Sequence, residues 1–325
     1  MNYGLPYIGS KNRIAKKILD VLPAAPVLYD VFCGGCAVTH AAMLSGKYQR
    51  FVINDRRGWL PDAFRKAIHG GYAHEDRWIS REDFERLKST DAYAAMCFSF
   101  GNNARTYMYA CPLERYKRAL HYAIFWRDFA PWRELCPETA DALASGLAPI
   151  EDRKQRRIQA GHFIVESLKA QLAAGTLTPD ILQKPIYRQI RRSKGAMTTV
   201  ETLQSLESLE RLESLERLGR LERLPGALTA HSGDYRELCF DEPGIIYCDP
   251  PYKDTTVYGE DCAGPFCHDE FYGWCEAQKL PVYISEYQMP EERFACIAEW
   301  DKVTTMAAKT TSHVTERLWR PRTQL

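Results

Sequence analysis

The chain has 325 residues, of which 45% are hydrophobic and 26% are charged, and its net charge is +1. This is the composition of a globular protein with enough apolar residues for a sizeable core, in one large domain or two smaller ones. No run of about 18 apolar residues occurs, so we expect no membrane span. The N-terminal residues lack the basic and then apolar pattern of a signal peptide, so we expect a cytoplasmic protein.

The first sixty residues alternate helix and strand signals. Apolar residues spaced along one helix face predict a helix over residues 11–22, and Pro23 ends it. A strand, a glycine turn, a helix of small residues, a second strand and an acid then follow one another, over residues 27–32, 34–35, 37–44, 51–53 and 54–55. This order is typical of a parallel α/β nucleotide-binding half.

The middle of the chain has a different pattern. Ser80-Arg81-Glu82-Asp83 predicts a capping box that opens a helix. Residues 99–133 are rich in Tyr, Phe, Trp and Arg, and residues 134–195 are predicted to be mainly helical and basic.

A leucine repeat follows, with leucine at every third position from Leu203 to Leu224 in Ser-Leu-Glu and Arg-Leu-Glu triplets. A period of three fits neither an α-helix nor a strand, and long 3₁₀ helices are uncommon. Glu and Arg residues four positions apart favour an α-helix. We expect a helical or partly ordered excursion, which is either a contact surface or a tolerated expansion of the triplet.

From Leu228 the α/β pattern returns. The sequence predicts a strand that runs into Asp249, then a helix and a further strand, over residues 244–248, 269–279 and 281–285. We therefore predict one α/β domain, formed by residues 1–60 and 226–325. An insertion over residues 61–225, which includes the leucine repeat, splits this domain.

The eleven cysteines are scattered, which is typical of reduced thiols in a cytosolic protein. Cys33-Gly34-Gly35-Cys36 has the spacing of a redox motif but lacks its usual sequence context. Cys262, Cys267, His268 and Cys275 have metal-binding side chains, but their spacing matches no common zinc pattern. We therefore predict no metal site.

The tetrapeptide Asp249-Pro250-Pro251-Tyr252 lies directly after a predicted strand, where α/β sheets bind ligands. An aryl amine is a poor nucleophile, because its lone pair is conjugated into its ring. The Asp249 carboxylate and the Pro250 carbonyl can accept both amino hydrogens, on a turn that the prolines fix. Tyr252 offers a face for base stacking, which is worth about 1–3 kcal/mol. The motif also occurs as a simple turn, but here it predicts catalysis at a base amine by alignment and electrostatic preorganisation.

With these residues the sequence resembles the Dam-type N6-adenine-specific DNA methyltransferases. In that family a Rossmann-like domain binds S-adenosylmethionine (AdoMet), and a target-recognition region is inserted before the Asp-Pro-Pro-Tyr motif. The resemblance covers residues 3–60 and 228–290, is loose over 90–130 and is absent from 200–225. Four signals occur in the family's order: Tyr7-Ile8-Gly9-Ser10-Lys11, residues 30–36, Asn54-Asp55 and the tetrapeptide.

The resemblance implies AdoMet as cofactor. Tyr7 would lie on the cofactor, Lys11 would contact its methionine part, and Asp55 matches the acid that binds the ribose hydroxyls. The glycine loop lets the backbone approach the cofactor, although Cys36 replaces the family's last glycine. The resemblance also implies two cofactor contacts, Asp234 and Tyr235, about 15 residues before the tetrapeptide. The predicted cofactor-binding residues are Tyr7, Lys11, Asp30, Phe32, Gly34, Gly35, Asp55, Asp234, Tyr235 and Asp249.

Two segments are candidates for contact with DNA. Residues 98–107 loosely match the family's target-recognition stretch, and residues 184–194 contain five basic residues and no acidic one. A solvated basic face is the alternative interpretation. The predicted DNA-binding residues are Asn102, Asn103, Arg105, Tyr107, Lys184, Arg188, Arg191 and Arg192.

The sequence thus predicts an α/β protein with a Rossmann-like AdoMet-dependent methyltransferase sheet and an inserted, mainly helical target-recognition domain. We expect methyl transfer to N6 of a flipped adenine in double-stranded DNA, with Asp249, Pro250 and Tyr252 as catalytic residues. Methylation of N4 of cytosine, methylation of an RNA base and non-catalytic nucleic-acid binding are the alternatives. The recognised DNA sequence, a role in restriction–modification, phage or regulation, and the oligomeric state stay open.

Overall fold

The structure is a computed structural model, and it describes residues 3–7, 9–192, 227–253, 266–306 and 310–325. The chain divides into two compact units. Unit 1 comprises Met1–Ala73 and Leu215–Leu325, and unit 2 comprises His74–Ser214. The predicted leucine repeat, residues 203–224, lies outside the described residues.

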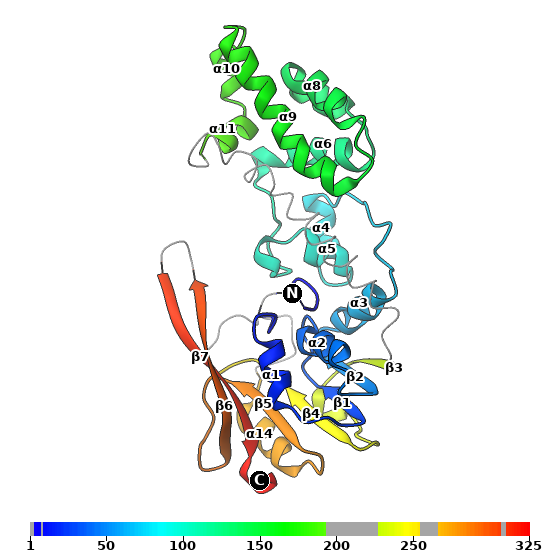
Figure 1. The fold of residues 1–325 in the computed structure, drawn as a ribbon, viewed down its shortest axis with the longest axis vertical. Coiled ribbons are helices and arrows are strands. Elements are labelled where there is room, and N and C mark those ends of the chain that lie inside the picture. The colour runs from blue at the N-terminus through cyan, green and yellow to red at the C-terminus, as the bar shows by residue number, and fades with distance from the viewer. Residues whose placement is uncertain (1–2, 8, 193–226, 254–265, 307–309) are drawn as a thin grey trace. The chain divides into compact units, whose positions relative to one another are not determined.

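Unit 1 is a mixed α/β structure (Figure 1). Its N-terminal part contains α1 (Ala15–Val21), β1 (Val27–Asp30), α2 (Ala37–Ser45), β2 (Arg50–Asp55) and α3 (Trp59–Ile68). Its C-terminal part contains β3 (Ala227–Ser232), η3 (Tyr235–Glu237), β4 (Gly244–Cys248), α14 (His268–Ala277), β5 (Val282–Glu286), β6 (Phe294–Met306), β7 (Thr310–Pro321) and η4 (Arg322–Gln324).

The seven strands form one sheet in the order β3-β2-β1-β4-β5-β7-β6. The first five strands are parallel, whereas β7 is antiparallel to both β5 and β6. This mostly parallel sheet confirms the predicted Rossmann-like α/β fold. The strand order reverses between β1 and β4, and the carboxyl ends of strands at such a switch point are where open α/β sheets bind ligands.

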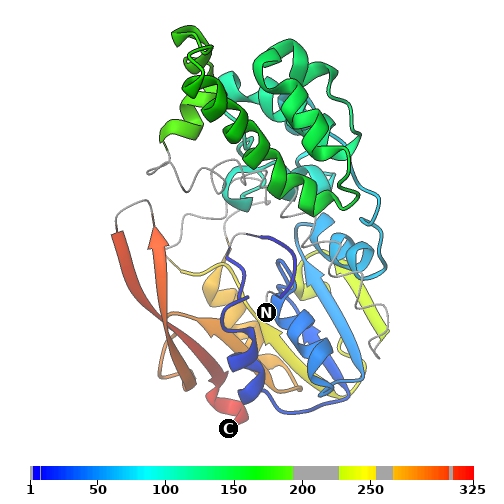
Figure 2. The same ribbon diagram turned by 45° about the horizontal axis from the view of Figure 1, so that its top comes forward.

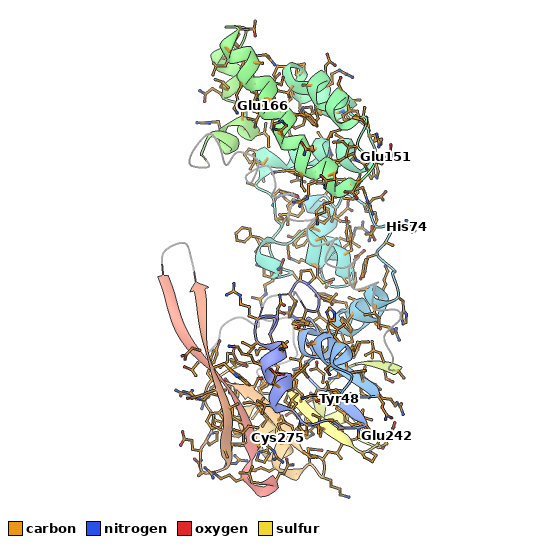
Figure 3. The ribbon with its side chains drawn as sticks, viewed as in Figure 1. Tyr48, His74, Glu151, Glu166, Glu242 and Cys275 are labelled. Atoms are coloured by element: carbon orange, nitrogen blue, oxygen red, sulfur yellow. The ribbon has the colours of Figure 1, made fainter. Side chains whose placement is uncertain are left out.

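Alternating side chains of β1 explain why helices cover both faces of the sheet. Val27 and Tyr29 belong to a buried cluster with Phe271 and Cys275 of α14. The side chain of Asp30 points to the opposite face, where Thr39 of α2 donates a hydrogen bond to it. Figure 3 marks Cys275 within unit 1, where it is fully buried.

Several predicted elements agree closely with the observed ones, and the N-terminal helix differs. The sequence predicts it from residue 11, but α1 begins at Ala15, because residues 12–14 form a turn instead. The long antiparallel hairpin of β6 and β7 was not predicted. None of the helices in the described residues is both long and apolar enough to cross a membrane.

Unit 2 consists mainly of helices, which Figure 2 shows from a second direction. They are α4 (Arg81–Leu87), α5 (Ala92–Cys97), η1 (Phe100–Asn102), α6 (Cys111–Phe125), α7 (Ala130–Leu135), α8 (Pro137–Leu147), α9 (Arg153–Ala173), α10 (Pro179–Leu182) and α11 (Pro185–Arg192). The two helices α8 and α9 approach closely at Gly146, where an added Cβ would lie 2.5 Å from the Phe163 ring. A side chain at this position would therefore force the Phe163 ring or the helices to shift.

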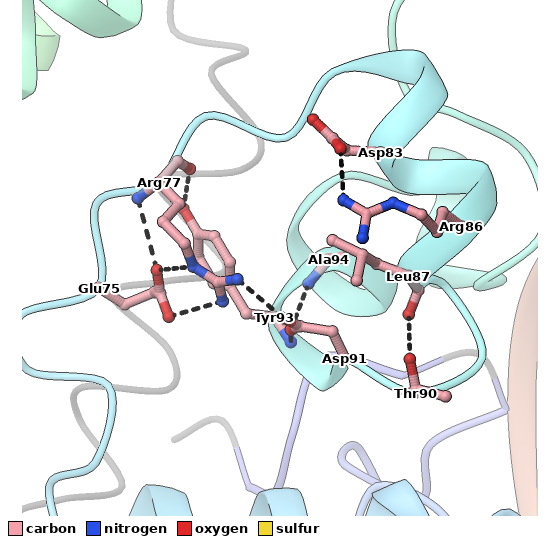
Figure 4. A network of polar contacts seen from close by, with 9 residues as sticks. All are labelled: Glu75, Arg77, Asp83, Arg86, Leu87, Thr90, Asp91, Tyr93 and Ala94. Carbon is pink, nitrogen blue, oxygen red and sulfur yellow. Dashed lines mark hydrogen bonds and ion pairs between the residues drawn. The ribbon is translucent and has the colours of Figure 1, made fainter.

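Polar side chains fix the first helices of unit 2. The predicted helix start at Ser80 is confirmed, since its hydroxyl accepts the Asp83 amide at 3.1 Å. Asp91 caps α5 by accepting the amides of Tyr93 and Ala94 at 2.9 and 3.1 Å (Figure 4). The guanidinium of Arg77 binds Asp91 at 2.9 Å and so ties the preceding segment to this cap.

Candidate active site

The glycine loop after β1 is held by its neighbours on both sides. The amide of Val31 donates to the Tyr247 carbonyl of β4 at 3.0 Å, and the amide of Cys33 donates to the Asn54 carbonyl of β2 at 2.8 Å. Gly34 has a φ of +47°, a conformation that glycine adopts without steric cost. The loop is therefore anchored on the two strands that flank β1.

The N-terminal segment lies directly against this loop. The Leu5 amide donates to the Gly35 carbonyl at 2.6 Å, and a Cβ on Gly35 would lie 2.9 Å from the Leu5 carbonyl oxygen. Tyr7 is buried, and the Arg57 guanidinium donates to its hydroxyl at 2.9 Å. The predicted cofactor residues Tyr7, Gly34 and Gly35 are thus neighbours in space, although the sequence separates them by 27 residues.

Asp55 braces the same loop from β2. One carboxylate oxygen accepts the Gly34 amide at 2.9 Å, and the other accepts the Arg57 amide at 2.9 Å. Burial raises the pKa of the Asp55 carboxyl, while these two amide donors oppose the rise. Each carboxylate oxygen has a second lone pair, so these contacts are compatible with an additional hydroxyl ligand.

Asp30 contains an unsatisfied polar atom at the strand switch point. It is 2% exposed, and the Thr39 hydroxyl donates to one carboxylate oxygen at 2.6 Å. Among the described residues, the other oxygen has no hydrogen-bond partner although it is buried. Burial raises the pKa of Asp30 to about 7. A buried acceptor of this kind suits a ligand that brings a cationic donor.

Asp249 extends β4 at the same edge of the sheet. Its carboxylate forms an ion pair of 2.8 Å with the ammonium of Lys11, which is 6% exposed. Burial raises the pKa of Asp249 against the opposing charge of Lys11. Burial by itself would lower the pKa of Lys11, but Asp249 and Glu316 raise it overall. The carboxylate of Asp249 thus raises the pKa of Lys11, and the ammonium of Lys11 opposes the rise in the pKa of Asp249.

Tyr252 is nearly enclosed. It is 9% exposed, and the Lys11 ammonium lies 4.5 Å from its ring centroid. The ring of Tyr287 meets it edge to face, with centroids 4.5 Å apart. Stacking of a base on Tyr252 stays a prediction.

Three residues that contact the motif or the residues beside it were not identified as site residues from the sequence. His268 donates from Nε2 to the Pro251 carbonyl at 3.0 Å, and Glu316 accepts the Tyr252 hydroxyl at 2.7 Å. Glu286 accepts the amides of Tyr287 and Lys253 at 2.7 and 3.3 Å, and burial raises its pKa to about 8. Glu286 ends β5, so its position at a strand end could have identified it from the sequence. Glu316 lies inside β7 and had no such signal.

Three other predicted cofactor residues, Phe32, Asp234 and Tyr235, make contacts of a different kind. Phe32 and Tyr235 belong to one aromatic group, with ring centroids 5.2 Å apart. Asp234 caps η3, and Arg236 binds both of its oxygens at 2.8 and 2.9 Å, which lowers its pKa. Cofactor contact by Asp234 and Tyr235 stays a prediction.

The cysteines near the site are free thiols. Cys33 and Cys36 are both buried, and burial raises the pKa of each thiol. Cys36 has a φ of +56° and precedes α2, so the chain accepts a left-handed non-glycine residue here. Cys262 lies outside the described residues. Among the described residues, no three metal-binding side chains form a group.

The predicted DNA-binding residues lie in unit 2. Asn103 shapes the loop over residues 98–108 by accepting the amides of Arg105 and Thr106 at 2.8 and 3.0 Å. Asn102 has a φ of +59° in the same loop. Tyr107 is 5% exposed and donates to the Ile79 carbonyl at 2.8 Å, so it packs within the unit.

The second basic segment is partly committed to internal contacts. The Lys184 ammonium binds the Glu138 carboxylate at 2.8 Å and the Leu135 carbonyl at 2.8 Å. Arg188 of α11 is exposed. Arg191 and Arg192 also belong to α11, but their side chains lie outside the described ones. DNA contact by this segment stays a prediction.

Comparison with known families identifies one match. Residues 7–108 match the model of the D12 class N6 adenine-specific DNA methyltransferase family. The matched region contains Tyr7, Lys11, the glycine loop and Asp55, but it ends before residues 249–252. No curated protein matches the chain. The match confirms the resemblance that the motifs indicated, and it supports N6 adenine-specific methylation of DNA as the activity.

Proposed function

We propose that this chain, a relative of the D12 class N6 adenine-specific DNA methyltransferases, transfers a methyl group from AdoMet to N6 of an adenine flipped out of double-stranded DNA. One observation supports this most directly. Asp249, which can accept hydrogens from an amine, lies after β4 at the same sheet edge as Asp30 and the glycine loop after β1. The parallel pairing of β1 and β4 thus brings the predicted cofactor and acceptor residues together.

The residues of this edge fit AdoMet chemically. The buried, unsatisfied oxygen of Asp30 suits the ammonium of a methionine group, and Lys11 suits its carboxylate. Asp55 offers carboxylate lone pairs for ribose hydroxyls. The glycines at 34 and 35 keep the backbone accessible, since side chains would extend toward Tyr7 and residue 5. When bound, AdoMet would supply an electrophilic methyl group on a sulfonium.

The chain's own groups would act on the adenine. The Asp249 carboxylate and the Pro250 carbonyl accept the two amino hydrogens, which directs the nitrogen lone pair toward the methyl group. His268 holds the Pro251 carbonyl and so fixes the turn that presents these acceptors. Because the amine becomes acidic only after transfer, Asp249 acts mainly by orientation and charge and then accepts a proton.

Burial has a catalytic use at this edge. Several carboxylates lie close together in a region of low polarity, and the Lys11 ammonium partly compensates their charge. Such preorganised charges stabilise a developing positive charge more strongly than they would in water. The acids therefore bind the cationic methyl donor and stabilise the positive charge that develops on the amine.

The test is transfer of label from AdoMet to DNA by the purified full-length chain. We expect labelled N6-methyladenine in digests of the DNA, and at least a roughly 1000-fold loss with Asp249→Ala. Calorimetric AdoMet binding and thermal unfolding of the variant would establish that it folds. Label on cytosine or on RNA would replace adenine in DNA as the substrate. No transfer by folded, AdoMet-binding protein would contradict the proposal.

A further inference from the structure

The tyrosine of the 249–252 motif is held by an acid that lies 64 positions further along the chain. The Tyr252 hydroxyl donates to Glu316 Oε2 at 2.7 Å, and the two residues are 9% and 1% exposed. Lys11 and Tyr287 contact the ring itself. Both the ring and the hydroxyl of Tyr252 are therefore fixed by neighbours from other elements of unit 1.

The antiparallel direction of β7 explains how Glu316 reaches this edge. In the pairing of β5 with β7, Ile284 lies opposite Trp319 and Glu286 lies opposite Arg317. One residue earlier in β7 is Glu316, which therefore lies just beyond the carboxyl end of β5. A strand that ran parallel to β5 would have reached this edge at its own carboxyl end instead.

Glu316 also belongs to the charge arrangement around Lys11. Asp249 binds the Lys11 ammonium directly, and Glu316 acts on it as a second nearby anion. Burying a carboxylate in this way costs free energy unless donors and cations compensate it. The Tyr252 hydroxyl provides such a donor, and Lys11 provides the positive charge.

We propose that Glu316 is a positioning residue for methyl transfer, which fixes the Tyr252 ring through its hydroxyl and helps to hold the Lys11 ammonium beside Asp249. The inference rests on the proposed function and extends it to β7. A shift of the ring by a fraction of an ångström would misalign a stacked base relative to the methyl group. Misplacement by about 1 Å costs rates of the order of 100-fold in enzymes.

The experiment compares variants of the full-length chain by single-turnover methylation of DNA. Glu316→Gln keeps the length and an acceptor for Tyr252 but removes the charge, whereas Glu316→Ala removes both. Tyr252→Phe removes the other partner, and the double variant Tyr252→Phe/Glu316→Ala tests their coupling. Glu299→Gln is the matched control, since Glu299 lies on β6 and is 66% exposed. AdoMet binding and thermal unfolding are measured for each protein.

We expect Tyr252→Phe and Glu316→Ala each to lower the transfer rate by about 100-fold, with little further loss in the double variant, since the two residues act as a unit. Glu316→Gln should lose less. AdoMet affinity should stay within about threefold of that of the parent. The control variant should retain the parent rate.

The pH profile separates a positioning role from a purely structural one. The ionisable groups that interact with Asp249 come from several elements and are Lys11, Asp30, Asp55, Tyr247, Cys248, Tyr252, Glu286, Tyr287 and Glu316. Removal of the Glu316 charge lowers the Asp249 pKa, because a neighbouring anion is lost. The acid limb of the Glu316→Gln rate profile should therefore move to lower pH.

The possible outcomes are distinguishable. Suppose that the parent and Glu299→Gln transfer methyl groups. If the Glu316 variants then fold and transfer methyl groups at the parent rate and with the parent pH profile, the inference is overturned and the proposed function stands. Additive losses in the double variant would also contradict it. If the folded parent transfers no methyl group to any nucleic acid, the proposed function fails first, and the positioning role fails with it.

Discussion

The two regions that the sequence selects for function are built in opposite ways. In unit 1, the carboxyl-edge site (Lys11, Asp30, Asp55, Asp249, Tyr252, Glu286 and Glu316) consists of polar groups that are mostly buried, and Lys11, Asp249, Tyr252 and Glu316 contact one another. In unit 2, the 98–108 loop is shaped by hydrogen bonds to its own backbone, such as those that Asn103 accepts. Substitutions in the first region should therefore disturb charge and rate, whereas those in the second should disturb affinity for DNA.

Both regions use left-handed backbone positions, but in different surroundings. Gly34 and Cys36 have positive φ beside the buried site, and Gly101, Asn102 and Ala104 have positive φ in the loop. The same local geometry is thus combined with burial in one case and with partial exposure in the other. A left-handed turn alone therefore does not indicate whether a substitution will be tolerated.

The largest effect on stability is expected for Lys11→Met. It removes the partner of a buried carboxylate, which should lower the free energy of unfolding by about 3 kcal/mol at pH 8. The loss should be smaller at pH 5, because burial raises the pKa of Asp249 and removal of the Lys11 charge raises it further. Methyl transfer should fall at least about 100-fold. Denaturation at both pH values and single-turnover rates measure these effects.

A double variant provides the control for this prediction. Lys11→Met/Asp249→Asn leaves no unpaired charge at the ion pair, so it should recover most of the lost stability but none of the activity. Equal stability losses in the single and double variants would show that the packing of the Lys11 side chain matters more than its charge. The carboxyl-edge site would then resemble an ordinary core.

The next largest effect concerns Asp30 and has opposite signs for stability and binding. Burial raises the pKa of Asp30 from 3.8 to about 7. Between these two pH values the folded protein keeps the carboxyl proton, whereas the unfolded chain has lost it. The stability contribution of this group is therefore present at low pH and is lost as pH rises toward 7. Asp30→Asn should raise the free energy of unfolding at pH 8 by roughly 1–3 kcal/mol, since it removes a buried charge.

The same substitution should weaken AdoMet binding by about tenfold at pH 8, because a charge-assisted contact with the ammonium is lost. In the parent, AdoMet affinity should fall as pH drops below about 7, where Asp30 becomes neutral. Calorimetry over pH 6–8 with both proteins checks this. A pH-independent affinity in the parent, or unchanged affinity in the variant, would place the cofactor ammonium elsewhere.

The parts of this design that could be predicted from the sequence are those with a local signature. The apolar strands, the glycine loop and the acids that follow strands indicated the α/β fold, which the sheet confirms. They also indicated the resemblance to the N6 adenine-specific DNA methyltransferases, which the family match confirms over residues 7–108. They also selected Asp30, Asp55 and Asp249, which the structure brings to one sheet edge. Parallel strands make this possible, because acids at their carboxyl ends necessarily converge.

The contribution of β7 could not be predicted in this way. Glu316 lies between Thr315 and Arg317 in a segment whose polar residues suggest exposure, yet it is 1% exposed. Its burial depends on an antiparallel return and on a register with β5, neither of which leaves a local pattern. His268 illustrates the same limit, since the sequence offered it only as a metal ligand, whereas it anchors the Pro251 carbonyl.

A smaller effect is expected in the 98–108 loop. Arg105→Gln should reduce the slope of log affinity for DNA against log salt by about 1, as expected for the loss of one phosphate contact. AdoMet binding and the single-turnover rate at saturating DNA should not change. Arg133→Gln is the matched control, because Arg133 is 56% exposed and binds Asp141 in the same unit. An unchanged slope in Arg105→Gln would remove this residue from the DNA interface.

The smallest effect compares a left-handed residue from each region. Relief of a left-handed non-glycine residue is worth about 1 kcal/mol. Ala104→Gly should therefore stabilise the protein by roughly 0.5–1 kcal/mol, since the half-buried alanine loses few contacts. Cys36→Gly gains the same relief but loses a fully buried side chain, so its net change should be close to zero. Urea denaturation of both variants measures the difference. Equal stabilisation would mean that the burial of Cys36 contributes nothing to the change, and the contrast between the two regions would then fail at these two positions.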